Sequence, residues 1–366
     1  MKILILNFRD VQHPDAGGSE RSGHILAKDL VSRGHTVTFF CSAFVGCLSE
    51  EMIDGVTYVR RGNLYTVYVW ALWLYHTRFR SSVDVILEDI NGIPWFTVLY
   101  SRKPKAILLH HIHQKVFFHQ LPWYVAVFAL FAERSLVLFY RSVPILTVSP
   151  AVKRELVSFG LPEKHITLVY NGIDTGFAPL THSDEPLLVS VGRVRAYKRL
   201  DLLVDAFVLV LEKIPSAKLI IIGAGDALEN IKRLVKEKQL AGSVLFTGYV
   251  SDAKKQEILG KAWVYCITSS EEGWGIGVIE ANASGCPAVA FSVGGLLDSI
   301  QDGSTGYLVP FGDVTQFAQK TIQLLEHKRL RTSMGKKALA WSSHFTWKQW
   351  TDVIERVLED AYDKKV

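Results

Sequence analysis

Short, almost continuously apolar segments alternate along the chain with longer segments whose apolar residues recur at a helical period. In the first half the apolar segments are KILILNF, HTVTFFCS, DVILEDI, AILLHHIH and PILTVS. The alternation returns in the second half with PLLVSVGR, AKLIIIGAGD, VLFTGYV, WVYCITS, PAVAF and GYLV. Strands buried on both faces and separated by helices are typical of parallel, doubly wound sheets. We therefore predict an α/β chain with two Rossmann-like domains.

A turn-rich segment with two prolines, LVYNGIDTGFAPLTHSDEP, lies between the two series of strands. It predicts an N-terminal domain over residues 1–172 and a C-terminal domain over 173–345, with a final helix in 346–366. Doubly wound sheets bind ligands beyond the carboxyl ends of their strands. Two of them in tandem predict a cleft between the domains, so the residues at strand ends are the candidates for function.

Composition restricts the class of protein. Of 366 residues, 49% are apolar and 21% charged, and the four cysteines form no CxxC pair, as expected for a globular protein of a reducing, cytoplasmic compartment. No segment reaches the roughly 18 uncharged apolar residues of a membrane span. The start, MKILILNFRD, is interpreted as a first strand and not a signal peptide. The net charge of +5 comes from residues 1–160, since the remaining residues balance.

Three strand ends of the predicted sheets carry groups suited to phosphates. Gly17 and Gly18 precede the first helix, where bare amides can face an acceptor. Arg193 ends one strand and Lys198 follows five residues later. The planar guanidinium of the arginine and the mobile ammonium of the lysine are placed to bind a diphosphate. Gly223 opens GAGD, which lacks the third glycine of a dinucleotide fingerprint, so NAD binding is not favoured. Tight turns and solvated basic loops are the alternatives.

The stretch EEGWGIGVIEANASGCPAVA sets two carboxylates, Glu272 and Glu280, on either side of Gly273, Gly275 and Gly277. Glycine is unfavourable within helices, so the pattern indicates a backbone that closely approaches a ligand, ending in a helix N-terminus. If the run were helical throughout, the carboxylates would lie about 12 Å apart along the axis. That separation is comparable to a hexose at one end of a ligand and a ribose at the other.

Taken together, these residues resemble the retaining nucleotide-sugar glycosyltransferases of family 4, which have the GT-B fold. The resemblance covers essentially the whole chain and rests on five motifs: the Gly17–Gly18 loop, SVGR with Lys198, IIGAGD, FTGYV, and the Glu-x7-Glu element followed by GG and DGSTGYLV. It implies no obligatory metal and no cofactor besides the donor substrate. It also implies that the final helix packs back on the first domain.

The resemblance further implies roles for individual residues. Arg193 and Lys198 would bind the donor diphosphate, helped by amides around Gly275 and Ile276. Glu272 would contact the transferred sugar and Glu280 the ribose. Main-chain groups of Gly248, Tyr249 and Val250 could meet the base, an expectation that rests on their position alone.

A histidine is expected at the end of the strand AILLHHIH, where the chain offers His110, His111 and His113. His110 best matches the family's position, with His111 second, and a buried structural histidine is the alternative for each. Three close histidines also raise a metal site. Because no carboxylate or cysteine ligand lies near them in the sequence, we predict none.

The acceptor must be inferred from the first half, which holds 18 of the chain's 41 aromatic residues between Tyr58 and Tyr140, interleaved with arginines and lysines. Such a mixture suits an anionic membrane surface, although an aromatic core with a basic exterior is the alternative. We expect a UDP- or GDP-sugar donor and a glycan or lipid-linked acceptor in cell-envelope polysaccharide, glycolipid or glycoprotein assembly. A non-catalytic sugar-nucleotide-binding subunit is the rival interpretation. Nucleic acid is not expected, because no binding module is recognisable.

Overall fold

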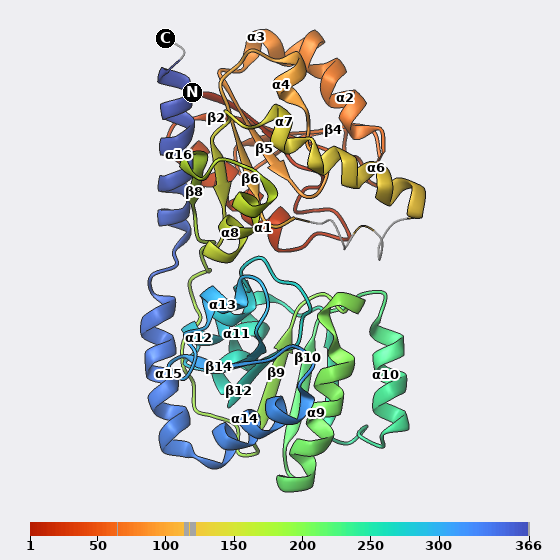
Figure 1. Ribbon diagram of the computed structural model, residues 1–366, viewed down its shortest axis with the longest axis vertical. Coiled ribbons are helices and arrows are strands. Elements are labelled where there is room, and N and C mark those ends of the chain that lie inside the picture. Colours follow the sequence, from red (N-terminus) through yellow and green to blue (C-terminus); the bar gives the residue numbers. More distant parts are fainter. Residues whose placement is uncertain (64, 113–116, 118–121, 365–366) are drawn as a thin grey trace. The chain divides into compact units, whose positions relative to one another are not determined.

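The computed structural model describes residues 1–63, 65–112, 117 and 122–364, which form two compact units (Figure 1). Unit 1 comprises Met1–Asn171 and Trp347–Val366, and unit 2 comprises Gly172–Thr346. The chain therefore passes from one unit to the other twice, once after residue 171 and once after residue 346.

Unit 1 is built on an eight-stranded sheet in the order β3-β4-β2-β1-β5-β6-β7-β8. Its strands are β1 (Lys2–Leu6), β2 (Thr36–Cys41), β3 (Glu50–Ile53), β4 (Val56–Arg60), β5 (Val85–Ile90), β6 (Lys105–Leu109), β7 (Ile145–Thr147) and β8 (Ile166–Leu168). All neighbouring strands pair in parallel except β3, which forms an antiparallel hairpin with β4. The central strands β1 and β5 are buried on both faces, as their near-continuous apolar sequences predict.

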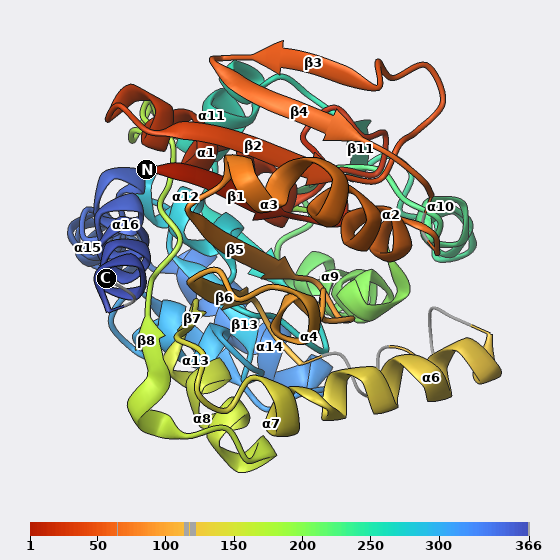
Figure 2. The same ribbon diagram turned by 90° about the horizontal axis from the view of Figure 1, so that it is seen from above.

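Helices cover both faces of this sheet. They are α1 (Gly18–Ser32), α2 (Val67–Leu74), the π-helical turn η1 (Tyr75–Phe79), α3 (Arg80–Ser82), α4 (Thr97–Tyr100), α6 (Trp123–Arg134), α7 (Leu136–Phe139), α8 (Pro150–Phe159), the short turn η2 (Glu163–His165) and α16 (Trp347–Asp363). Figure 2 shows α1 and α16 on one side of the sheet, with α2 and α6 on the other side. Helices on both faces are what a parallel sheet needs to bury its apolar residues.

Helix α16 follows unit 2 in sequence but completes the core of unit 1. Its apolar face, Trp350, Ile354 and Leu358, is buried in one cluster with α1 and the central strands. At the rim of this contact the Arg33 guanidinium pairs with both Asp352 (2.7 Å) and Glu355 (2.6 Å). The last helix is therefore a structural part of the first sheet's core.

Unit 2 is built on a six-stranded, fully parallel sheet in the order β11-β10-β9-β12-β13-β14. Its strands are β9 (Leu187–Val191), β10 (Lys218–Ile222), β11 (Val244–Gly248), β12 (Val264–Ile267), β13 (Ala288–Phe291) and β14 (Gly306–Val309). Its helices are the short turn η3 (Ala196–Lys198), α9 (Leu200–Lys213), α10 (Leu228–Glu237), α11 (Asp252–Lys261), α12 (Ile276–Ala283), α13 (Leu296–Ser299), α14 (Val314–Glu326) and α15 (Lys328–Ser342). The strand order changes direction at β9, and in such sheets the carboxyl ends at the change of direction form the ligand site.

None of the helices in the described part of the chain combines the length and the apolar character needed to cross a membrane.

Replacing Trp350 by alanine is expected to destabilise unit 1 by about 3–5 kcal/mol, because a fully buried indole leaves a large cavity. The free energy of unfolding of unit 1, measured by urea titration, checks this. Lys348→Ala, on the exposed side of the same helix, is the control and should change stability by less than about 0.5 kcal/mol. A loss below about 1 kcal/mol for the tryptophan variant would contradict the role given to α16.

Candidate active site

The carboxyl end of β9 carries the two cations predicted to bind a diphosphate. Arg193 lies two residues beyond the strand, and Lys198 closes the short turn η3. The turn is tied to the end of β12, because the Thr268 hydroxyl donates to the Lys198 carbonyl (3.0 Å) and the Ser270 amide donates to the Tyr197 carbonyl (2.8 Å). Both cations line a narrow hollow at the ends of β9, β10 and β12.

The glycines of GAGD hold the Arg193 loop in place. A Cβ added to Gly223 would lie 2.0 Å from the Gly192 carbonyl oxygen, and one added to Gly225 would lie 2.2 Å from that of Val194. The Val194 amide donates to the Ala224 carbonyl (2.9 Å) across the same contact. These glycines therefore have a packing reason: they let two strand-end loops meet backbone to backbone.

Lys198 and Glu272 form a partly buried ion pair. The Lys198 ammonium donates to Glu272 Oε2 at 2.6 Å, and the two side chains are 15% and 18% exposed. Burial tends to lower the pKa of Lys198, but the negative charge of Glu272 outweighs it and the pKa is raised. The pair therefore holds a lysine charged at the edge of the hollow, ready to meet an anion.

Glu280 forms a second lysine–glutamate pair. It lies in α12, nearly buried, and its Oε1 accepts from the Lys255 ammonium at 2.6 Å. Lys255 belongs to α11, the helix that follows Tyr249 and Val250 at the end of β11. Tyr249 is largely exposed and Gly248 has a left-handed φ of 65°. The two glutamates predicted to bind a donor are thus held by different lysines from different strand ends.

The run between the glutamates is not helical throughout. Gly275 is the N-cap of α12 with a left-handed φ of 86°, and the helix begins at Ile276, so only Glu280 is helical. A Cβ on Gly277 would lie 2.4 Å from the buried hydroxyl of Tyr265. Burial raises the pKa of that hydroxyl, and the charges of Glu280 and Glu272 raise it further. The tyrosine hydroxyl thus lies directly against Gly277, and it donates to the Val191 carbonyl (3.3 Å).

The two glycines of the GG motif, Gly294 and Gly295, contact the backbone of the same loop. The Gly295 amide donates to the Glu272 carbonyl (2.6 Å). A Cβ on Gly294 would lie 2.3 Å from that same oxygen, and one on Gly295 would lie 2.0 Å from the Gly273 carbonyl oxygen. Residues far apart in sequence thus fix the backbone that carries Glu272.

In unit 1, His110 directly follows β6 and is nearly buried. Its Nε2 lies 3.1 Å from Oδ1 of Asp89, which stands at the end of β5. The other carboxylate oxygen of Asp89 accepts from the Asn7 amide (2.7 Å), just after β1. Three adjacent strand ends therefore converge on one aspartate, which orients the histidine.

The charges around His110 favour its protonated form. Burial acts to lower its pKa, but the charge and hydrogen bond of Asp89, with a contribution from Glu20, outweigh burial and raise it. Glu20 itself accepts from the Gly17 amide (2.7 Å) at the start of α1. The Gly17–Gly18 loop is therefore capped by a carboxylate of its own helix.

Among the other histidines considered, His111 is half-buried, and His113 lies outside the described residues.

Sequence reasoning missed Asn7, Asp89 and Lys255. Asp89 could have been found, since DVILEDI is an apolar strand that ends in two acids at the edge where ligands bind. Its neighbour Glu88 faces the opposite side, where it accepts from the hydroxyls of Thr97 and Tyr140. No sequence signal pointed to Lys255, because its partner is 25 residues away on another helix.

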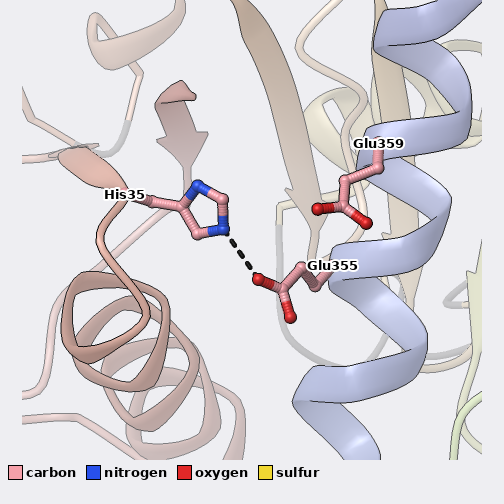
Figure 3. Close-up of side chains that lie close together, drawn as sticks. All are labelled: His35, Glu355 and Glu359. Atoms are coloured by element: carbon pink, nitrogen blue, oxygen red, sulfur yellow. Dashed lines mark hydrogen bonds and ion pairs between the residues drawn. The ribbon is translucent and has the colours of Figure 1, made fainter.

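Among the described residues, one group of three side chains has the spacing of metal ligands: His35, Glu355 and Glu359 (Figure 3). His35 Nε2 lies 2.7 Å from Glu355 Oε1, and Glu355 Oε2 also accepts from Arg33. His35 precedes β2, so the cluster lies at the amino end of that strand, away from the ends that carry Asp89 and His110. With an arginine already bound to its central carboxylate, we interpret the cluster as part of the ion-pair network that docks α16.

Unit 2 also has a groove of about 590 Å³ at the amino ends of its strands, lined among others by Ser183, Lys218 and Gly242. It contains none of the predicted site residues, and ligands of doubly wound sheets bind at the opposite edge.

Comparison with solved structures defines the class of fold. The chain is similar to sucrose-phosphate synthase from Thermosynechococcus elongatus, with a TM-score of 0.85 and 20% identity over 99% of both chains. It is also similar to Anabaena HepE, solved with UDP and glucose, with a TM-score of 0.76 and 18% identity over 98% of this chain and 100% of that one. The predicted GT-B fold is confirmed.

Sequence comparison identifies the family. The model for glycosyl transferases group 1 matches residues 174–341, and that for glycosyltransferase family 4 matches residues 16–177. N-acetyl-alpha-D-glucosaminyl L-malate synthase of Bacillus anthracis is 28% identical over 350 residues, which cover 89% of each chain. The chain belongs to glycosyltransferase family 4 and is a hexosyltransferase that uses nucleotide sugars.

Asp89→Asn is expected to lower the pKa of His110, because it removes the negative charge that raises it. A histidine with a raised folded-state pKa stabilises the fold below its unfolded pKa, and this contribution is lost as the pH rises through the folded value. The variant should therefore lose more stability below about pH 6 than above about pH 8.

Titration of the His110 ring protons by NMR checks this prediction. Asp84→Asn, at the amino end of the same strand, is the control and should leave the pKa of His110 unchanged. An unaltered pKa in the Asp89 variant would show that the carboxylate does not support the charge.

Proposed function

We propose that the chain transfers a hexose from a UDP-sugar, with a GDP-sugar as the second choice, to a lipid-linked or glycan acceptor, with retention of anomeric configuration. The observation that supports this best is the pair of lysine–glutamate contacts at the strand ends of unit 2. The carboxylates of Glu272 and Glu280 can accept hydrogen bonds from sugar hydroxyls, and the cations Arg193 and Lys198 can bind a diphosphate. These groups match the parts of a sugar nucleotide. The UDP bound in the structure of the similar Anabaena HepE favours UDP.

Arg193 and Lys198 are assigned to the donor diphosphate, together with the amides of Gly275 and Ile276 at the start of α12. During transfer, the bond from the sugar to the β-phosphate breaks and the acceptor oxygen bonds to the same carbon. The acceptor's proton leaves with the phosphate. Cations and helix amides fixed beside the phosphate stabilise the negative charge as it develops, without needing to reorganise.

Glu272 is assigned to the transferred sugar and Glu280 to the ribose. In the described structure Lys198 neutralises Glu272. A diphosphate would compete for that lysine and leave the Glu272 carboxylate to accept hydrogen bonds from sugar hydroxyls. Tyr249 and Val250, at the end of β11, are assigned to the base. Arrival of the donor therefore converts an internal ion pair into two contacts with the ligand.

Unit 1 is assigned to the acceptor, and His110, oriented by Asp89, is its catalytic residue. Residues 172–346, as unit 2, are assigned to the donor. No metal is assigned a role, because the basic side chains and helix amides already supply positive charge to the phosphates.

The outer surface of α6 supports a lipid-linked acceptor at an anionic membrane face. The apolar residues that α6 buries are all alanines: Ala126, Ala129 and Ala132. The residues that it exposes are mostly large and aromatic: Trp123, Tyr124, Phe128 and Phe131. Soluble helices bury their large apolar residues, so this helix has the reverse polarity. Aromatic side chains at that position suit the interfacial layer of a bilayer.

A second exposed apolar helix lies on the same side of the sheet. Figure 2 shows α2 and α6 both on the side away from α16. The exposed residues of α2 are Val69, Trp70, Leu72 and Trp73, and exposed arginines of this part of unit 1 are Arg80, Arg102, Arg134 and Arg141. Each basic residue near an anionic surface contributes on the order of 1 kcal/mol to binding. Together they favour peripheral contact with the membrane.

Glu272→Ala is expected to reduce transfer at least about 100-fold while the protein still binds nucleoside diphosphate, because one contact to the reacting sugar is lost. The assay supplies UDP- and GDP-hexoses and measures release of nucleoside diphosphate and binding in parallel. Glu271→Ala is the neighbouring control and should retain activity. Full turnover by the Glu272 variant would refute its assignment, and absence of donor-dependent release by the wild type would favour a non-catalytic role.

The double variant Phe128→Ser, Phe131→Ser is expected to lose flotation with vesicles that contain phosphatidylglycerol, because it removes both exposed phenylalanines of α6. The wild type should float with these vesicles at low salt, and less so at high salt. Leu245→Ser, which removes an exposed apolar residue of unit 2, is the control. Equal flotation of wild type and double variant would show that α6 is not the membrane contact.

A further inference from the structure

Lys255 is placed with its ammonium toward the interior of unit 2, unlike its neighbour in α11. The helix begins after Ser251, whose hydroxyl accepts from the Lys254 amide (3.3 Å) and so sets the register. Lys254 pairs with Glu257 and remains 54% exposed. Lys255 is 15% exposed and contacts Glu280. Only the second lysine of this adjacent pair therefore belongs to the site.

Three groups fix the Lys255 ammonium. Its Nζ is 2.6 Å from Glu280 Oε1 and 3.7 Å from Asp252 Oδ1. It also lies 5.3 Å from the centre of the Phe177 ring, a distance at which an aromatic face attracts a cation. The Phe177 side chain packs against the core cluster of β9 and β12. The position of the ammonium is therefore built into the fold before any ligand binds.

A buried carboxylate needs a nearby positive charge if it is to accept hydrogen bonds from neutral hydroxyl groups in its charged form. Burial favours the protonated form of a carboxyl group, and a nearby ammonium reverses this preference. An ionised carboxylate has about four lone-pair sites on two oxygens, so it can accept hydrogen bonds from hydroxyl groups while it is paired with an ammonium. Hydrogen bonds to a charged acceptor are stronger than those to a neutral one.

We propose that Lys255 is a positioning residue that makes the site selective for ribose over deoxyribose, by holding the Glu280 carboxylate in place for the ribose hydroxyls. The proposal rests on the assignment of Glu280 to the ribose made above. The two lysines differ in whether the bound ligand would break their ion pair with glutamate. A diphosphate competes with Glu272 for Lys198, whereas neutral ribose hydroxyls donate to Glu280 and leave its lysine in place. The Lys198–Glu272 pair thus serves the diphosphate and the transferred sugar, and the Lys255–Glu280 pair serves the ribose.

The test compares the affinities of UDP and 2′-deoxy-UDP, and of GDP and 2′-deoxy-GDP, by calorimetry. The wild type is expected to prefer the ribonucleotide by about tenfold, as for one hydrogen bond to a charged acceptor. Lys255→Met should reduce the preference to less than about threefold, mostly by weakening the ribonucleotide. Lys255→Arg should retain it, since the positive charge is kept. Lys254→Met, the exposed neighbour, should behave as wild type.

Near-wild-type affinity of the Lys255→Met variant for the deoxynucleotide, with an unchanged melting temperature, shows that the fold is intact. Glu280→Gln should lose the preference as Lys255→Met does. If Glu280→Gln loses the preference and Lys255→Met keeps it, this inference is wrong while the ribose assignment stands. If Glu280→Gln keeps it, both fail. Binding of neither UDP nor GDP to the wild type would refute the proposed donor itself.

Discussion

Parallel pairing of β9 with both β10 and β12 brings three strand ends to one edge of the unit 2 sheet. Every group assigned to the donor's diphosphate and sugar depends on this edge, because the loops that carry Arg193, Lys198 and Glu272 start there. The loops are then joined by backbone contacts that leave no room for a Cβ at Gly223 or Gly295. The ion pair between Lys198 and Glu272 closes the arrangement. A site of opposite charges is thus held by a rigid backbone.

The glycines illustrate how a correct motif can have a different physical cause. Their density between the two glutamates indicates close approach of a backbone to a ligand. The structure supplies protein atoms for two of these contacts: Leu296 against Gly275 and the Tyr265 hydroxyl against Gly277. Both partners are distant in sequence, so no local pattern could name them. The crowding at these two glycines therefore comes from the fold itself, and the close approach of a ligand stays a prediction.

Burial divided the aromatic residues of the first half in a way their number alone could not. Tyr58 and Tyr140 are buried in unit 1, where they serve the core. In α6 the aromatic residues are exposed, and alanines occupy the face that packs on the rest of unit 1. Composition allows either a core or a surface for each ring, because both environments accept aromatic side chains. The packing of each helix on the sheet decides whether an aromatic side chain is buried, since one face of the helix contacts the sheet and the other face stays exposed.

The sequence by itself determined the two doubly wound sheets, the family, and the strand ends that carry the candidate site, because periodicity and glycine position are local properties of the chain. It also pointed to Glu272, Glu280, Arg193 and Lys198. Only the tertiary structure decided which charges pair, since Lys255 and Asp89 meet their partners through helix register and strand order. The family resemblance had implied that the last helix packs back on the first domain, and the structure shows that Trp350, Ile354 and Leu358 carry this contact. Pairing between side chains that are distant in sequence depends on how the whole sheet packs, and a short segment of sequence does not contain that information.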